Sequence, residues 1–286
     1  MAMTIEDILQ KTTDLPTIPA AALRVIQEAD LSSCTASTVA STISTDQSLT
    51  AKVLRLSNSA YYGLSREIVD LQEAVVVLGM RCVRNLAMVA ATYPWMSKAL
   101  TGYSLEPRAM WTHSFGTAVG AQLIAQRARI KNDDTAFTAG LLHDLGKVAL
   151  SVWLEKRFNV IVSVAERESL PFNLAEKRVL GFDHTEVGYH LAKSWNIPDT
   201  LALAIRYHHA PSESPVKNTF VDCVHVGDYL TMTMGFGLGG DGLHYEFDED
   251  SLDRLGLSFT DLDAIMDAFV HSYHAYDSLF QELSVA

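Results

Sequence analysis

The stretch Leu-Leu-His-Asp-Leu-Gly-Lys at residues 141–147 decides how the rest of this sequence is interpreted. His143 and Asp144 place an imidazole beside a carboxylate, with a leucine on either side of the pair. Putting two such groups in apolar surroundings costs on the order of several kcal/mol unless partners replace the lost water. We therefore expect polar or metal partners for both side chains elsewhere in the chain.

Further side chains with metal-binding atoms lie before and after this stretch. In chain order, the candidate metal ligands are His113, His143, Asp144, His184, His208, His209 and Asp228. Their irregular spacing predicts a site to which several separate helices contribute. First-row metals accept imidazole nitrogen and carboxylate oxygen together, so we expect one or two divalent ions of iron, manganese or zinc.

Hydrolysis of a phosphoester is the reaction that such a site favours, because two divalent ions polarise a phosphoryl group and activate water. Lys147 lies three residues after Asp144, on the same side of a continuing helix, where it would neutralise a phosphate or the departing oxygen. Asp144 and Lys147 are therefore the candidate catalytic residues. The other histidines are interpreted as ordinary core or surface residues: His190, His225, His244, His271 and His274.

Composition and charge disfavour several classes of function. The 286 residues include 34 acidic and 22 basic side chains, a net charge of −12, which disfavours binding to a nucleic-acid backbone. No apolar run approaches the roughly 18 residues of a membrane-spanning helix. The acidic start Met-Ala-Met-Thr-Ile-Glu-Asp lacks the pattern of a signal peptide. We expect a cytoplasmic protein that binds neither nucleic acid nor membrane.

The cysteines predict no chemistry of their own. Cys34, Cys82 and Cys223 lie far apart and include no Cys-x-x-Cys spacing, which argues against a disulfide framework and against a thiolate metal site. We expect all three to be small buried apolar residues.

The periodicity of apolar residues is helical almost throughout, and alternating β-branched runs are scarce, so we expect an all-α, multi-helix bundle. Pro94 is expected to close an N-terminal group of helices, and Gly146 to break the helix that ends at the His-Asp pair. We divide the chain into an N-terminal helical bundle (1–100), a metal-binding helical subdomain (101–234), and a glycine-rich connector with C-terminal helices (235–286).

Two parts of the chain resemble known families. The order H…HD…K…H…HH…D, between about Trp111 and Tyr229, resembles the HD superfamily of metal-dependent phosphohydrolases, and in its full form the HD-GYP cyclic-di-GMP phosphodiesterases. Leu-Pro-Thr-Ile-Pro at 15–19 and the stretches 43–60 and 74–79 resemble the HDOD family. Together these parts cover about residues 15–230, so the chain is similar to HDOD proteins.

The resemblance implies an HD-superfamily helical bundle and a bacterial regulatory protein with signalling proteins as partners. By motif it assigns one metal ion to His113, His143, Asp144 and Asp228, and the second ion to Asp144, His184, His208 and His209. Ala109 stands where trinuclear HD-GYP sites offer a glutamate, which implies at most two ions. No Gly-Tyr-Pro string follows the histidine pair, which argues against cyclic-di-GMP as the substrate.

Two functions therefore remain open. In the first, the chain hydrolyses a phosphoester of a small phosphorylated or nucleotide-like ligand. In the second, it is a non-catalytic regulatory scaffold that binds partner proteins. The complete order of ligands favours the first function, and the missing Gly-Tyr-Pro string favours the second.

Overall fold

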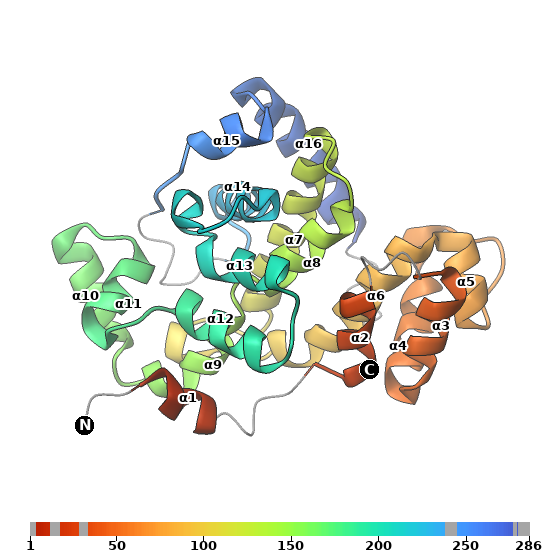
Figure 1. Cartoon of the computed structure of the whole chain (residues 1–286), viewed down its shortest axis with the longest axis horizontal. Coiled ribbons are helices and arrows are strands. Elements are labelled where there is room, and N and C mark those ends of the chain that lie inside the picture. The colour runs from red at the N-terminus through yellow and green to blue at the C-terminus, as the bar shows by residue number, and fades with distance from the viewer. Residues whose placement is uncertain (1–3, 12–17, 29–33, 238–244, 277–278, 280–286) are drawn as a thin grey trace. The chain divides into compact units, whose positions relative to one another are not determined.

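The computed structural model describes residues 4–11, 18–28, 34–237, 245–276 and 279. Helices make up the regular structure of these residues, and one isolated bridge joins Leu100 to Leu105 (Figure 1). The predicted all-α class is therefore confirmed. Within the described ranges, no helix has both the length and the apolar character that crossing a bilayer requires.

The contacts divide the chain into two compact units, each made of segments that are not contiguous in the sequence. The smaller unit comprises residues 16–95 and 270–286, and the larger unit comprises 1–15 and 96–269. The three consecutive domains proposed from the sequence stay a prediction.

The smaller unit consists of helices whose ends the sequence marks clearly. It contains α2 (Ala20–Glu28), α3 (Ala36–Ser44), α4 (Gln47–Ser57), a 3-10 turn η2 (Ala60–Tyr62), α5 (Leu71–Leu78) and most of α6 (Met80–Met96). Asp46 and Asp70 are the N-caps of α4 and α5. The carboxylate of Asp46 accepts a hydrogen bond from the backbone N–H of Leu49 at 2.9 Å, and that of Asp70 accepts one from the backbone N–H of Glu73 at 2.8 Å. The apolar face of α4, which includes Val53 and Leu56, is buried.

The larger unit carries the candidate site. Its helices are α1 (Ile5–Lys11), α7 (Ala109–Arg127), α8 (Asp133–Leu142), α9 (Leu145–Leu154), α10 (Phe158–Glu168), α11 (Phe172–Leu180), α12 (His184–Ser194), α13 (Asp199–Tyr207), α14 (Thr219–Thr233) and α15 (Asp250–Leu255), with 3-10 turns η3 (Thr101–Tyr103) and η4 (Pro211–Glu213). The long buried helices α7, α8 and α14 pack on one another, and α9 and α12 form a second packed pair. The site lies where these two groups meet.

The predicted helix break at Gly146 is wrong, whereas Pro94, which was predicted to close the N-terminal helices, is adjacent to Trp95, where the first segment of the smaller unit ends. Pro94 lies inside α6, where a proline in the last turn removes one hydrogen bond while the following Trp95 and Met96 remain buried. Gly146 lies within α9 instead of breaking a helix. A Cβ atom at Gly146 would lie 1.8 Å from the backbone oxygen of His184, so this glycine permits the close approach of α12.

Two other expectations are met only in part. All three cysteines are free, but Cys34 and Cys82 are half-buried and only Cys223 is buried as predicted. Cys82 lies in the first turn of α6, where its sulfur is 3.0 Å from the hydroxyl of Tyr62. Of the C-terminal helices expected within 235–286, α16 (Phe259–Ala275) is described. Most residues after 276 lie outside the described residues, as do residues 238–244 of the glycine-rich connector, which include His244.

Candidate metal centre

Four of the candidate ligands meet where α7, α8, α9 and α14 approach one another. His113 lies in α7, Asp228 lies in α14, and His143 and Asp144 form the junction between α8 and α9. The Nε2 atom of His113 lies 3.2 Å from Nε2 of His143 and 3.1 Å from Oδ1 of Asp228. All four side chains are buried.

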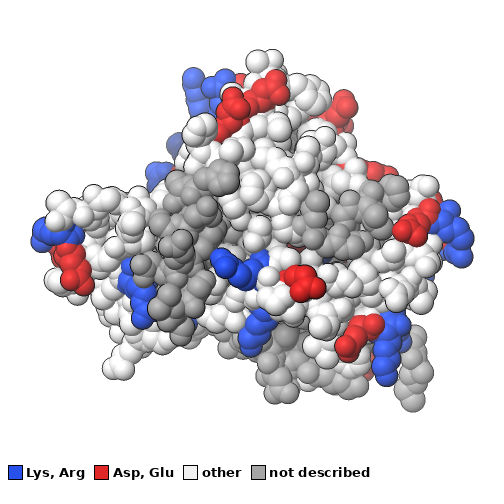
Figure 2. Space-filling model, turned by 180° about the vertical axis from the view of Figure 1, so that it is seen from behind, with Lys and Arg blue, Asp and Glu red and all other residues white. Residues whose placement is uncertain are grey.

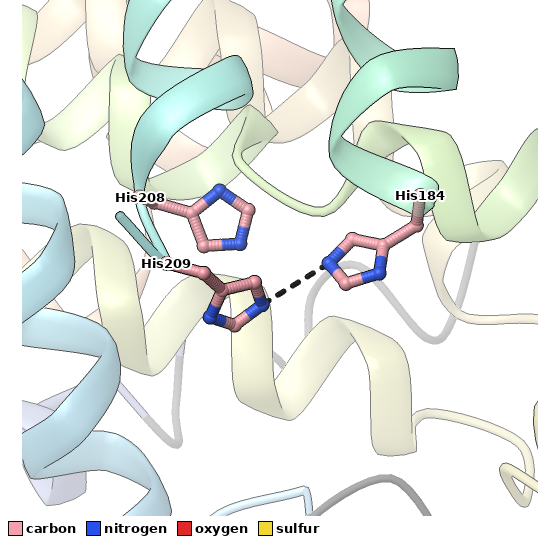
Figure 3. A group of neighbouring side chains, drawn as sticks. All are labelled: His184, His208 and His209. Carbon is pink, nitrogen blue, oxygen red and sulfur yellow. Dashed lines mark hydrogen bonds between the residues drawn. The ribbon is translucent and has the colours of Figure 1, made fainter. Parts of the chain in front are cut away.

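The remaining candidates, His184, His208 and His209, form an adjacent cluster of imidazoles (Figure 3). His184 begins α12, and the other two residues directly follow α13. Nε2 of His209 lies 3.2 Å from Nε2 of His184. The structure thus brings all seven sequence-predicted residues into one region of the larger unit.

Asp144 lies between the two clusters. Its Oδ2 atom is 3.5 Å from Nε2 of His113 and 3.4 Å from Nε2 of His143. Its Oδ1 atom is 3.3 Å from Nε2 of His184 and 3.7 Å from Nε2 of His208. One carboxylate oxygen therefore faces each cluster, which is the arrangement that a bridging carboxylate needs.

Three imidazoles are held with Nε2 toward the centre of the site. Nδ1 of His143 lies 2.7 Å from the backbone oxygen of Gly140, and Nδ1 of His208 lies 2.9 Å from that of Ile205. Because a carbonyl oxygen can only accept, both Nδ1 atoms carry a proton, and in a neutral ring this tautomer presents the Nε2 lone pair. Nδ1 of His184 is engaged in the same way by a carboxylate, that of Glu176. This orientation of the ring is typical of metal-binding histidine.

Some buried polar atoms at the centre have no hydrogen-bond partner among the described residues. They include Oδ1 of Asp144 and Nε2 of His208. Leaving such atoms unpaired in a protein interior is costly, so each one calls for an explanation. Together with the mixed nitrogen and oxygen donor set, these atoms fit a divalent cation.

The electrostatics of His208 and Asp144 favour the protonation states of metal ligands, whereas, against the effect of burial, Asp228 raises the pKa of His113 and Glu176 raises the pKa of His184. Burial, followed by the neighbouring imidazole of His143, holds the pKa of His208 well below its usual range, so this ring is neutral at pH 7. Burial alone would raise the pKa of Asp144, but Lys147 and His143 hold it well below the usual value. The Lys147 ammonium lies 2.7 Å from Oδ2 of Asp144, as the three-residue spacing predicted. Neutral imidazole and ionised carboxylate are the forms that bind metal.

Three residues that support the site were not identified from the sequence. Glu176 contacts His184, and the imidazole of His225 contacts the backbone oxygen of His208 with Nδ1 at 2.6 Å. Tyr245 places its ring 5.6 Å from the ring of His209. Of the three, only His225 was considered from the sequence, and its interpretation as an ordinary buried residue omitted this supporting contact.

A pocket of about 140 Å³ gives access to the site from outside. Candidate site residues on its wall are His113, Lys147, His184, His209 and Asp228. The rest of the described lining includes aromatic and aliphatic side chains and two carboxylates near the surface: Phe172, Leu174, Met232, Tyr245, Glu213 and Glu246. Among the described lining residues, Lys147 is the one lysine or arginine, so it is the group suited to pair with an anionic ligand.

Comparison with known proteins assigns the chain to a family. The model of the HDOD domain matches residues 15–211, which is more than half of the chain. This protein therefore belongs to the HDOD domain family, as the resemblance in sequence implied.

Solved structures agree with this assignment. The chain is 28% identical to an HDOD domain protein with unknown function from Geobacter sulfurreducens, with a TM-score of 0.80 and coverage of 96% of both chains. A structure from Shewanella amazonensis SB2B, named "Putative phosphohydrolase", is 24% identical, with a TM-score of 0.69 and coverage of 96% of this chain and 97% of that one. At that identity, the second likeness shows the fold alone.

A curated relative is longer than this chain. An uncharacterized protein of Treponema pallidum (strain Nichols) is 26% identical over 233 residues, which cover 80% of this chain and 44% of the relative. The chain thus spans less than half the length of the curated relative that it matches.

Proposed function

We propose that this HDOD protein binds one or two divalent ions of iron, manganese or zinc and hydrolyses a phosphoester of a nucleotide-like ligand in bacterial signal transduction. One ion would be held by His113, His143, Asp144 and Asp228, and the second by Asp144, His184, His208 and His209. The observation that carries the proposal is the convergence of four buried imidazoles, those of His113, His143, His184 and His208, on the two carboxylate oxygens of Asp144.

The protein's own groups have separate tasks in this proposal. Bound divalent ions would supply polarisation of the phosphoryl group and activation of water. Asp144 holds the two ligand clusters together, because each of its oxygens faces one of them. The ammonium of Lys147 lines the pocket and would pair with a phosphate oxygen as negative charge develops there.

A second candidate function is a non-catalytic scaffold that binds signalling proteins. The smaller unit favours it, because three valines in and beside α5 expose much of their surface: Val69 (72%), Val76 (76%) and Val77 (45%). Contiguous exposed apolar surface is a common feature of protein interfaces. If the protein is a scaffold, the metal site would stabilise or regulate the chain without hydrolysing a substrate.

Hydrolysis by metal-loaded protein separates the two functions. We would assay an activated aryl phosphodiester, an aryl phosphomonoester and cyclic dinucleotides with each of the three metals. The catalytic proposal expects turnover that falls by about 10²–10³-fold in Lys147→Met, because one charge-stabilising group is removed. Lys156→Met, which changes an exposed lysine of the same unit, is the matched control. Bound metal without turnover of any of these esters would instead favour the scaffold.

A further inference from the structure

The two ligand clusters offer different chemistry to a metal ion. The two-imidazole cluster consists of His113, His143 and Asp228, and the three-imidazole cluster consists of His184, His208 and His209. Asp144 adds one oxygen to each. Imidazole-rich sets suit zinc, whereas two imidazoles with carboxylate oxygen suit ferrous iron and manganese.

The three-imidazole cluster also has a carboxylate behind it. Glu176 is completely buried, with 0% of its surface exposed. Its Oε2 atom lies 2.6 Å from Nδ1 of His184 and accepts a second hydrogen bond from the backbone N–H of His184 at 3.0 Å. Its Oε1 atom accepts a hydrogen bond from the Tyr103 hydroxyl at 2.5 Å. Glu176 is thus fixed on both oxygens and oriented toward a single imidazole.

The two-imidazole cluster lacks an equivalent support in the described structure. Nδ1 of His113 is buried and makes no hydrogen bond with the described residues. Nδ1 of His143 contacts a neutral backbone carbonyl. A carboxylate on Nδ1 fixes a histidine ring and makes Nε2 a stronger donor than a carbonyl does. The two clusters therefore differ both in donor type and in the strength of their support.

We propose that Glu176 is a positioning residue that makes the three-imidazole cluster a zinc-selective position, while the two-imidazole cluster takes a harder ion such as Mn²⁺. The inference rests on the proposed metal site and adds that its two metal positions prefer different ions. Glu176 acts only through His184, because its two oxygens are already occupied by His184 and Tyr103.

Competition between two metals tests this inference without any assay of activity. Metal-free protein would be given two equivalents each of Zn²⁺ and Mn²⁺, so that either ion could fill both positions, and the bound ions measured by elemental analysis and by the electron paramagnetic resonance of Mn²⁺. The parent is expected to hold one of each. Glu176→Gln is expected to bind Zn²⁺ about 10- to 100-fold more weakly and to keep Mn²⁺. Asp228→Asn is expected to bind Mn²⁺ more weakly and to keep Zn²⁺.

Glu186→Gln is the matched control, because Glu186 lies on the same helix as His184 but pairs with Lys177 and Arg206 near the surface. It should behave as the parent does. Circular dichroism would check that each variant folds. If Glu176→Gln does not fold, Tyr103→Phe replaces it and should weaken Zn²⁺ binding by a smaller factor.

The possible outcomes are distinguishable. Parent-like Zn²⁺ binding by folded Glu176→Gln would overturn the role of Glu176. Loss of Zn²⁺ from Asp228→Asn, or Zn²⁺ in both positions of the parent, would overturn the assignment of the clusters. A parent that binds neither ion would overturn this inference, and a parent that also fails to bind Fe²⁺ under anaerobic conditions would refute the proposed metal site itself.

Discussion

His225 shows how much the candidate site depends on a residue that is not a ligand. Its Nδ1 atom lies 2.6 Å from the backbone oxygen of His208, and its Nε2 atom accepts a hydrogen bond from the backbone N–H of Asp248 at 2.9 Å. One buried imidazole therefore joins the end of α13 to the chain that precedes α15. Burial lowers its pKa, so the neutral ring that makes both contacts is favoured at pH 7.

Replacement of His225 by leucine should destabilise the protein. The backbone groups of His208 and Asp248 would lose their partner, and a buried unsatisfied group costs about 1–3 kcal/mol. Denaturant unfolding of metal-free protein measures this loss. His190→Leu, at an exposed position of α12, is the control and should change the free energy of unfolding little. Equal stability of the two variants would show that His225 is not a structural link.

At the scale of residues, the residues that meet in the candidate site could be predicted from the sequence, whereas the residues that contact and support them could not. The adjacent histidine and aspartate at 143 and 144, with further histidines before and after them, form a pattern of metal-binding side chains that is visible in the sequence. Glu176, by contrast, lies in the string Ala-Glu-Lys-Arg, which is typical of a solvent-exposed helix face. Its complete burial depends on contacts with His184 and Tyr103, 8 and 73 residues away, which local spacing does not reveal.

At the scale of elements, the contact between α9 and α12 determines where Asp144 and His184 lie. Gly146 in α9 meets the backbone of α12 with no room for a side chain, since a Cβ atom would lie 1.8 Å from the His184 oxygen and 2.7 Å from the nitrogen of Gly188. From the sequence alone, this glycine is predicted to break a helix. A close approach between two helices has no signature in the local sequence, which explains the wrong boundary.

Gly146→Ala should therefore separate α9 from α12. Overpacking of a close contact costs about 1–3 kcal/mol, so the free energy of unfolding should fall by at least that amount. Zinc binding should weaken as well, because His184 begins α12. Thermal unfolding and metal titration are the measurements, with Ser163→Ala on the exposed face of α10 as the control. Unchanged stability in Gly146→Ala would contradict the close approach.

The start of α16 provides a test of the pH dependence. Asp261 accepts hydrogen bonds from the hydroxyl and the backbone N–H of Ser258 at 2.7 and 2.9 Å, and it pairs with Arg127 at 2.5 Å. These contacts lower the pKa of Asp261 to about 2 from 3.8. A lowered carboxyl pKa means that the contribution to stability is complete above about pH 4 and is lost as the pH falls toward 2.

Asp261→Asn should therefore remove part of the acid sensitivity of folding. Its free energy of unfolding should lie below that of the parent at pH 6, and the difference should shrink as the pH falls from 4 to 2. Urea unfolding across this range measures the effect. A difference that stays constant with pH would mean that ionisation of Asp261 does not stabilise the start of the helix.

At the scale of the whole molecule, charge and chain order limit what local patterns can predict. The net charge of the sequence is −12, and on the face shown in Figure 2 acidic and basic side chains lie near one another. Each compact unit combines segments from distant parts of the sequence, such as 16–95 with 270–286. The periodicity of the chain predicts the helices, but it contains no information on which distant helices share a unit.

The proposed function requires that the residues around Asp144 bind divalent metal. Elemental analysis of the parent, purified without an affinity tag under air and anaerobically, measures this binding. We expect one to two equivalents of iron, manganese or zinc in the parent, most of it lost from Asp144→Ala while helicity is kept, and none lost from Asp263→Ala at an exposed position of α16. A parent that remains metal-free after reconstitution with each ion, or an Asp144→Ala variant that keeps its metal, would contradict the account.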